Sequence, residues 1–160
     1  MKPWLARCAY SLLLRLLVPA YGLRLWWRGR AEPLYRHAVA ERVGLYGGRG
    51  GAQAWSGGLW VHAVSLGETR AASALIAHLR ILRPGLRLLL THSTATGREA
   101  GRALLRDGDV QAWLPFDTPG GVQRFFAHFR PAVGVLMETE IWPNLLHAAD
   151  DAGVPMVLAN

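Results

Sequence analysis

Apolar and polar positions change their period repeatedly after residue 58 of the chain. Short, nearly continuous apolar runs alternate with segments in which apolar residues recur at helical spacing. The apolar runs predict strands at 59–64, 86–91, 110–114, 132–137 and 155–159. The helical spacing predicts helices at 69–82, 97–107, 120–129 and 142–152. Strands that are apolar throughout are typical of parallel sheets covered on both faces, so the alternation predicts an α/β fold with a Rossmann-like parallel sheet and helices on both faces.

The carboxyl ends of these strands are where this fold class places a ligand. Open α/β sheets bind ligands in the crevice at that edge. The strand ends read HAVSLGE, THSTATG, PFDTP, METE and LAN, and all but the last are rich in hydroxyls, carboxylates, histidines or glycines. Groups of this kind bind sugars and phosphates, so this edge is the predicted ligand site.

The string SLGE at 65–68 has two interpretations. It fits the capping box S-x-x-E, in which Ser65 accepts a hydrogen bond from the Glu68 amide and the Glu68 side chain reaches back. Alternatively, Glu68 is a general base, because a helix N-terminus favours a carboxylate and this one would face the crevice. Gly67 would let a substrate approach the backbone closely. The pattern by itself favours the cap.

The string HSTATG at 92–97 lacks both the G-x-G-x-x-G and the P-loop patterns, which disfavours a dinucleotide or P-loop site. Its hydroxyls and backbone amides are suited to hold a phosphate at a helix start. The alternative is simple N-capping by Thr96. The candidate binding residues of this string are Ser93, Thr94, Thr96 and Gly97.

The string METEIWPN at 137–144 places Glu138 and Glu140 two residues apart, just beyond a predicted strand. Two carboxylates in this position are suited to bind a hydroxyl-bearing ligand or a cationic partner. The alternative is structural, with Glu140 near a helix cap and Glu138 paired with an arginine. Both residues are therefore candidates for substrate binding.

The chain offers no metal-binding pattern. Its histidines are scattered without metal-ligand spacing or cysteine partners, so no metal site is predicted. The single cysteine, Cys8, excludes an intrachain disulfide.

Residues 1–29 are predicted to form a membrane anchor. The segment 8–23 is mostly apolar, but Arg15 interrupts it and Pro19 would kink a helix. Trp26 and Trp27 are of the residue type that lies at the headgroup level. A spanning helix and an interfacial helix both remain open, whereas a cleaved signal peptide is disfavoured because charge breaks the apolar core. A helix buried against the domain is the weaker alternative.

Residues 30–58 divide the anchor from the alternating region. The segment 30–46 is polar and predicted helical after Pro33, and seven glycines follow between Gly44 and Gly58. Such a glycine-rich stretch predicts a flexible connector. The expected organisation is therefore an anchor at 1–29, a helical segment and linker at 30–58, and a Rossmann-like domain at 59–160.

The net charge of +7 lies entirely in the N-terminal third. Residues 1–50 carry nine basic and two acidic residues, whereas basic and acidic residues balance from residue 51 onward. Basic charge beside the most apolar segment favours an anionic membrane surface as the partner. It argues against a nucleic acid, because no recognition motif accompanies it.

Taken together, these strings resemble the 3-deoxy-D-manno-octulosonic acid (Kdo) transferase family, in its N-terminal half. The resemblance is carried by WVHAVSLGE, THSTATG, LPFDTPGGVQRFF and RPAVGVLMETEIWPNLLHAADDAGVPMVLAN, and more loosely by RHAVAERVGLYG. The arginine-studded apolar N-terminus is also similar to the membrane anchor of that family.

The resemblance implies an inverting glycosyltransferase of the two-domain GT-B fold on the cytoplasmic face of the inner membrane. Such enzymes move Kdo from CMP-Kdo to a lipid A precursor in lipopolysaccharide synthesis, and no metal or other cofactor is implied. Glu68 matches the glutamate proposed as the base, and Ser65 and Gly67 would shape its loop. Ser93, Thr94, Thr96 and Gly97 become candidates for substrate contacts, and Glu138 and Glu140 for acceptor positioning or domain closure.

The family continues beyond the point that matches Asn160, into the rest of this domain and a CMP-Kdo-binding domain. By this resemblance, 59–160 is expected to be an incomplete acceptor-binding domain. We therefore expect the 160 residues to lack the donor domain and to show no transferase activity alone. Two other functions stay open. One is a membrane-anchored, non-catalytic lipid-binding module, and the other is a GT-B transferase for a different lipid-linked sugar.

Overall fold

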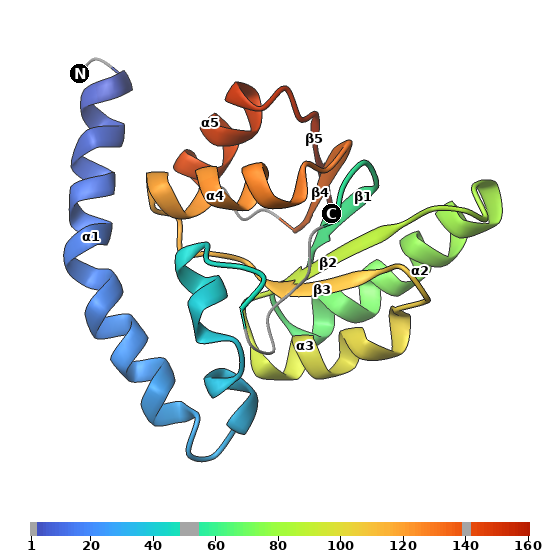
Figure 1. Cartoon of the computed structure of the whole chain (residues 1–160), viewed down its shortest axis with the longest axis horizontal. Helices are drawn as coiled ribbons and strands as arrows, with labels where there is room; N and C mark the ends of the chain where they lie inside the picture. The colour runs from blue at the N-terminus through green and yellow to red at the C-terminus, as the bar shows by residue number, and fades with distance from the viewer. Residues whose placement is uncertain (1–2, 49–54, 139–141) are drawn as a thin grey trace.

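A computed structural model describes residues 3–48, 55–138 and 142–160. The strands form one parallel sheet in the order β3-β2-β1-β4-β5, which confirms the predicted α/β class (Figure 1). Their bounds are β1 Leu59–His62, β2 Leu88–His92, β3 Val110–Trp113, β4 Val133–Met137 and β5 Met156–Ala159. The order changes direction between β1 and β4, so the crevice of this fold lies at the carboxyl ends of those two strands.

Helices cover both faces of the sheet, as predicted (Figure 1). Helices α4 and α5 lie on one face and α2 and α3 on the other. Their bounds are α2 Leu66–Leu82, α3 Ala95–Gly101, α4 Pro119–Phe129 and α5 Pro143–Asp151. A 3₁₀ turn, η3 Arg102–Leu104, continues α3.

The hydrophobic core has two layers, one on each face of the sheet. Successive side chains of a strand point to opposite faces, so Trp60 packs with Phe125 on the α4 side while Val61 packs with Ile76 on the α2 side. All four side chains are at most 1% exposed. Because the strand side chains that point to either face are apolar, each face of the sheet packs against a layer of helices.

Two helix boundaries differ from the predicted ones by three residues or more. Helix α2 begins at Leu66, not at 69, because Ser65 is its N-cap and the capping glutamate lies inside the first turn. Helix α3 ends at Gly101, well before the predicted end at 107. The Arg80 guanidinium binds the Leu104 carbonyl oxygen at 2.6 Å, and this hydrogen bond holds the chain in the tighter η3 turn instead of a longer helix.

Helix α1 spans Pro3–Arg28 and lies along the outside of the domain (Figure 1). Only one stripe of it faces the protein, at the helical spacing of Ser11, Leu14, Val18 and Leu25. The alternative of a buried helix is wrong, because only 6% of its apolar window is buried. By length and composition, Leu5–Arg28 is able to cross a membrane.

The segment after α1 covers the outer edge of β3. It contains two 3₁₀ helices, η1 Pro33–Arg36 and η2 Val39–Val43, where the pattern predicted one helical segment. The Glu41 carboxylate accepts the outward-facing N–H of Trp113 at 2.8 Å, and the Tyr46 hydroxyl donates to the Trp113 carbonyl oxygen at 3.2 Å. The edge of the sheet is therefore occupied by side chains of this segment.

Candidate functional site

The loop between β1 and α2 holds Glu68 in a capping box. The Ser65 oxygen accepts the Glu68 N–H at 3.4 Å, and the Ser65 hydroxyl donates to Glu68 Oε1 at 2.9 Å. The Val64 N–H donates to Glu68 Oε2 at 2.7 Å. The Glu68 side chain is buried, while Gly67 beside it is exposed. The predicted cap is thus confirmed, and the carboxylate lies at the carboxyl end of the central strand.

Capping does not exhaust the hydrogen-bonding capacity of Glu68. Each carboxylate oxygen has two lone pairs, and the hydrogen bonds from Val64 and Ser65 occupy one on each oxygen. These contacts therefore leave one lone pair on each Glu68 oxygen that is able to accept a hydrogen bond or a proton. A proton acceptor at this loop is chemically compatible with the cap.

The loop between β2 and α3 packs directly on the Glu68 loop. Thr94, not Thr96, is the N-cap: its oxygen accepts the Gly97 N–H at 3.2 Å, and its hydroxyl donates to the Val64 carbonyl oxygen at 2.7 Å. A Cβ on Gly97 would lie 2.9 Å from that same carbonyl oxygen, so the loops approach this closely only because residue 97 is glycine. The Thr96 side chain is exposed.

The carboxylates beyond β4 are only partly described. Glu138 is exposed and adopts a left-handed backbone conformation with φ of 61°, which is uncommon outside glycine. Its N–H donates to the Ala159 carbonyl oxygen at 2.8 Å, and among the described residues it has no ion pair with an arginine. Glu140 lies outside the described residues.

A cavity of about 400 Å³ lies between α1 and the carboxyl ends of β1, β2 and β3. Helix α1 supplies an apolar wall that includes Leu14, Leu17 and Val18. The opposite wall is formed by the strand-end loops, and it includes Ser93 and Thr94. Val64 lines the cavity, whereas Glu68 does not line it and is connected to it through the hydrogen bond from the Val64 N–H. The cavity is therefore amphiphilic and adjoins the candidate base.

Two arginines bring positive charge to this cavity. The Arg42 guanidinium lies 4.0 Å from the Trp113 ring centroid and 5.7 Å from that of Tyr35, and the two rings are stacked. Arg28 lies 4.9 Å from the same Tyr35 ring. Burial lowers the pKa of Arg42 to about 10, so its guanidinium stays protonated at neutral pH.

Asp117 joins α1 to the sheet domain at the far end of the cavity. It follows β3 and accepts the backbone N–H groups of Asn144 at 3.1 Å and Leu145 at 2.7 Å, which caps α5 from a distant loop. The Tyr10 hydroxyl of α1 donates to the same carboxylate at 2.9 Å. Burial raises the pKa of Asp117. This residue is thus a structural junction rather than a free acid.

The histidines at the strand ends are structural, although the pattern counted them among ligand-binding groups. His62 Nδ1 lies 2.9 Å from the Thr91 hydroxyl, and His92 Nδ1 lies 2.8 Å from the Ala63 carbonyl oxygen. Burial lowers the pKa of His62 to about 3 and that of His92 to about 4, so both imidazoles are neutral at pH 7. Among the described residues, no group of His, Cys, Asp and Glu side chains is arranged to hold a metal ion.

The sequence patterns missed the aromatic and arginine part of the site. Arg42, Tyr35 and Trp113 come together only because the segment after α1 folds over the edge of β3. The string ERVG that contains Arg42 was part of the family resemblance, but nothing in it indicates stacking on a residue 71 positions later in the chain. Of the predicted residues, Ser65, Gly67, Glu68, Ser93, Thr94, Thr96 and Gly97 do lie on two adjoining loops.

Comparison with known proteins identifies the family. Residues 37–160 match the family model described as 3-Deoxy-D-manno-octulosonic-acid transferase (kdotransferase). The 3-deoxy-D-manno-octulosonic acid transferase of Bordetella pertussis is 47% identical over 98% of this chain and 37% of its own length. That of Haemophilus influenzae is 37% identical over 81% of this chain and 30% of its own length.

A plant relative is also similar, namely the "Probable 3-deoxy-D-manno-octulosonic acid transferase, mitochondrial" of Arabidopsis thaliana. It is 38% identical over 64% of this chain and 23% of its own length. The chain thus spans well under half the length of these relatives. The family model covers the chain from η2 through the whole sheet, and the chain belongs to the 3-deoxy-D-manno-octulosonic acid transferase family, in its N-terminal domain.

Proposed function

We propose that this chain forms the acceptor-binding part of an inverting transferase that moves Kdo from CMP-Kdo to a lipid A precursor. The observation that carries the proposal is the position of Glu68, at the carboxyl end of the central strand and hydrogen-bonded to Val64, which lines a cavity with one apolar and one polar wall. An acceptor with acyl chains and a sugar headgroup matches those two walls. Membership of the family supports glycosyl transfer as the reaction.

Glu68 is the proposed general base. It takes the proton from the acceptor hydroxyl as the hydroxyl oxygen attacks the anomeric carbon of Kdo. The bond from that carbon to the phosphate oxygen of CMP breaks, and CMP leaves with the bonding electrons. The new bond forms on the face opposite the leaving group, so the configuration inverts. The hydrogen bonds from Val64 and Ser65 fix the carboxylate while this proton moves.

The loop residues around Glu68 have proposed supporting roles. Ser65 and Gly67 shape the loop, and Ser93 and Thr94 line the cavity in which the acceptor headgroup binds. Gly97 lets the two loops pack closely, and Thr96 and Glu138 are exposed and able to contact a substrate or a second domain. Glu140 is proposed for acceptor positioning from its sequence position alone.

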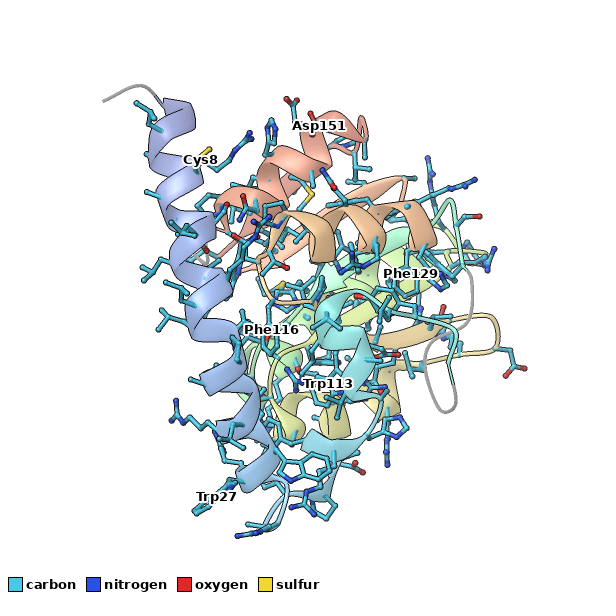
Figure 2. All side chains as sticks on the ribbon, turned by 60° about the vertical axis from the view of Figure 1, so that its left-hand side comes forward. Cys8, Trp27, Trp113, Phe116, Phe129 and Asp151 are labelled. Carbon is cyan, nitrogen blue, oxygen red and sulfur yellow. The ribbon has the colours of Figure 1, made fainter. Side chains whose placement is uncertain are left out.

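Helix α1 is proposed to lie in the membrane interface on the cytoplasmic face of the inner membrane. Its contacts with the domain run from Tyr10 to Leu25, so a helix crossing the bilayer would have to leave the domain. Trp27 lies on its outer surface (Figure 2), and both Trp27 and Leu16 are exposed side chains that would meet lipid. This orientation brings the cavity next to the acyl chains of a membrane-bound acceptor.

The donor site is proposed to lie in a second domain of the complete transferase. The chain spans 37% of the length of the Bordetella pertussis relative, and the proposal places CMP-Kdo binding in a part of the transferase that this chain does not span. Within this chain, the proposed division is an anchor at 1–29, a connecting segment at 30–58 and the acceptor domain at 59–160. The activity then requires both domains, and the isolated 160 residues are inactive.

Exchange of Glu68 in the complete transferase tests the base. Glu68→Gln keeps an oxygen that accepts the Val64 N–H but removes the proton acceptor, so kcat should fall by about 100-fold or more. Ser65→Ala loses the cap and should cost only about 1 kcal/mol of stability, with a smaller effect on kcat. Transfer of radiolabelled Kdo to the lipid acceptor measures both.

Glu99→Gln is the matched control, because this exposed glutamate of α3 makes only a surface ion pair with Arg102. It should leave kcat unchanged. If Glu68→Gln turns over at the rate of this control, Glu68 is a cap and not the base.

A further inference from the structure

The Arg42 guanidinium has an unusual environment for a buried charge. The residue is 4% exposed, and its Nε has no hydrogen-bond partner among the described residues. Its Nη2 donates to the Ser93 carbonyl oxygen at 3.3 Å, which is a long hydrogen bond. A buried charged group ordinarily has an ionic partner or several hydrogen bonds. Arg42 instead lies against Trp113 and Tyr35 and lines the cavity.

The carboxylate beside Arg42 in the sequence serves other groups. Glu41 pairs with Arg98 at 3.4 Å, and the same oxygen accepts the Trp113 N–H. Arg98 also lies over the Trp113 ring, at 4.6 Å from its centroid. Two guanidiniums therefore flank one indole. The ion pair with Arg98 is directed toward the sheet edge, while Arg42 is the one that lines the cavity.

The rest of the cavity suits an anion attached to an apolar group. Arg28 lines the same cavity and contacts the same Tyr35 ring as Arg42, and it also forms an ion pair with Glu32 at 2.8 Å. Arg42 is therefore the cation of this pair that forms no ion pair with a carboxylate among the described residues. Ser93 and Thr94 line the polar wall beside them. A tetrahedral phosphate accepts hydrogen bonds from several directions, and the planar fork of an arginine matches it. The opposite wall is the apolar stripe of α1.

We propose that this cavity binds the phosphate of a phosphorylated lipid, with Arg42 as the principal contact and Arg28 as the second. The inference rests on the proposed function, because it takes the acceptor to be the lipid in this cavity, and it adds that a phosphate on that acceptor is recognised here. Arg42 positions the acceptor headgroup relative to Glu68 and takes no part in the proton transfer. Apolar residues of α1 cover the first part of the acyl chain.

Binding of simple lipids to the 160-residue chain tests the proposal without any transfer. The chain is titrated in detergent with dilauroyl phosphatidate, with dilauroyl glycerol and with inorganic phosphate, by calorimetry. Phosphatidate should bind about tenfold or more tightly than dilauroyl glycerol, since charge-assisted hydrogen bonds are the stronger ones. Inorganic phosphate should bind more weakly than phosphatidate, because it lacks the acyl chain.

Variants assign the preference to Arg42. Arg42→Lys keeps the charge but loses the fork, and it should reduce the preference for phosphatidate about tenfold. Arg28→Gln changes an exposed residue and should reduce the preference for phosphatidate about threefold, since exposed charges contribute less to binding than buried ones. Arg15→Gln, an exposed arginine of α1 outside the cavity, controls for general attraction to the anionic micelle and should keep the preference. A thermal melt of each variant verifies that it is folded.

Three results would overturn the proposal. The first is equal affinity of the unmodified chain for phosphatidate and for dilauroyl glycerol. This test needs no variant, so it does not depend on whether Arg42→Lys folds. The second is an equal loss of preference in Arg15→Gln and Arg28→Gln. The third is inorganic phosphate binding as tightly as phosphatidate, which would make this a site for free phosphate.

The complete transferase separates this proposal from the proposed function. Arg42→Lys should raise the KM for a phosphorylated acceptor about tenfold with little change in kcat, and with an acceptor that lacks phosphate the difference should vanish. If phosphatidate binds through Arg42 but no Kdo is transferred, the proposed function fails and the phosphate site stands. If Arg42→Lys transfers Kdo to the phosphorylated acceptor as well as the unmodified transferase does, the phosphate site fails and the proposed function stands.

Discussion

Leucine is the commonest residue both of helix α1 and of the strands of the sheet, yet most of the leucine side chains in the two have opposite surroundings. Leu89 of β2 is fully buried between Trp60 and α4, whereas Leu16 of α1 is 71% exposed. Hydropathy alone does not distinguish the two segments. The difference teaches that the sheet obtains its apolar environment from the helices of this chain, whereas the described residues leave the outer surface of α1 uncovered, which is the surface proposed to face lipid.

The largest expected effect is a loss of folding stability in acid, which arises in the buried sheet and not in α1. Folded His62 and His92 have lowered pKa values, of about 3 and about 4, because burial opposes their charged forms. The unfolded chain binds protons on both from about pH 6.5 downward, so their stabilising contribution is complete above that pH and is lost as the pH falls toward 4. From pH 6.5 to 4.5, the free energy of unfolding should fall by about 5 kcal/mol.

Denaturant titrations at several pH values measure this loss. His92→Gln should roughly halve the slope, because one of the two groups is removed. A slope that is the same with and without His92 would mean that the carboxylates, and not these imidazoles, govern the acid sensitivity.

A matched pair of leucine substitutions tests the comparison directly. Leu89→Ala should lower the free energy of unfolding by about 3 kcal/mol, because it leaves a cavity in the core. Leu16→Ala removes the same atoms from an exposed position and should change it by less than about 0.5 kcal/mol in detergent.

In vesicle binding, Leu16→Ala should have the larger effect and Leu89→Ala the smaller one, which is the opposite of their effects on folding stability. Flotation with anionic vesicles should show weaker binding for Leu16→Ala and unchanged binding for Leu89→Ala, provided that the latter is folded. Equal membrane binding of Leu16→Ala and the unmodified chain would contradict the lipid-facing role of this surface.

The smallest expected effect concerns the junction between the two regions. Tyr10→Phe removes the hydrogen bond from α1 to Asp117, which should loosen the docking of α1 by about 1 kcal/mol. Asp117 keeps its hydrogen bonds from Asn144 and Leu145, so α5 should stay capped. Hydrogen exchange should then be faster in α1 and unchanged in α5. Faster exchange in α5 as well would show that the hydroxyl supports the cap.

The strands and the Glu68 cap were predictable because both depend on short-range patterns. A run such as LRLLLT is apolar at each position that the two helix layers cover, and Ser65 and Glu68 lie within one helical turn. The N-cap of α3 was predicted at Thr96 but is Thr94, because the Thr94 hydroxyl also reaches the Val64 carbonyl oxygen in a neighbouring loop. That contact is tertiary and leaves no trace in the local pattern.

The arginine part of the cavity was not predictable for the same reason. Arg42 is one of many arginines in a basic N-terminal third, and its spacing gives no indication of burial. Its position depends on the fold of residues 33–46 over the edge of β3, where the Arg42 carbonyl oxygen also accepts the Phe116 N–H at 2.8 Å. A charged residue becomes distinctive only when its surroundings are known.

The side chains of Glu41 and Tyr46 on Trp113 also limit how the sheet grows. They bond the outward-facing N–H and carbonyl oxygen of Trp113, so a new strand would have to displace them to pair with this end of β3. The strand at the opposite edge is β5. We therefore expect a strand that extends this sheet, whether from the same polypeptide or from a neighbouring molecule, to add beside β5 rather than beside β3, in assembly as well as in aggregation.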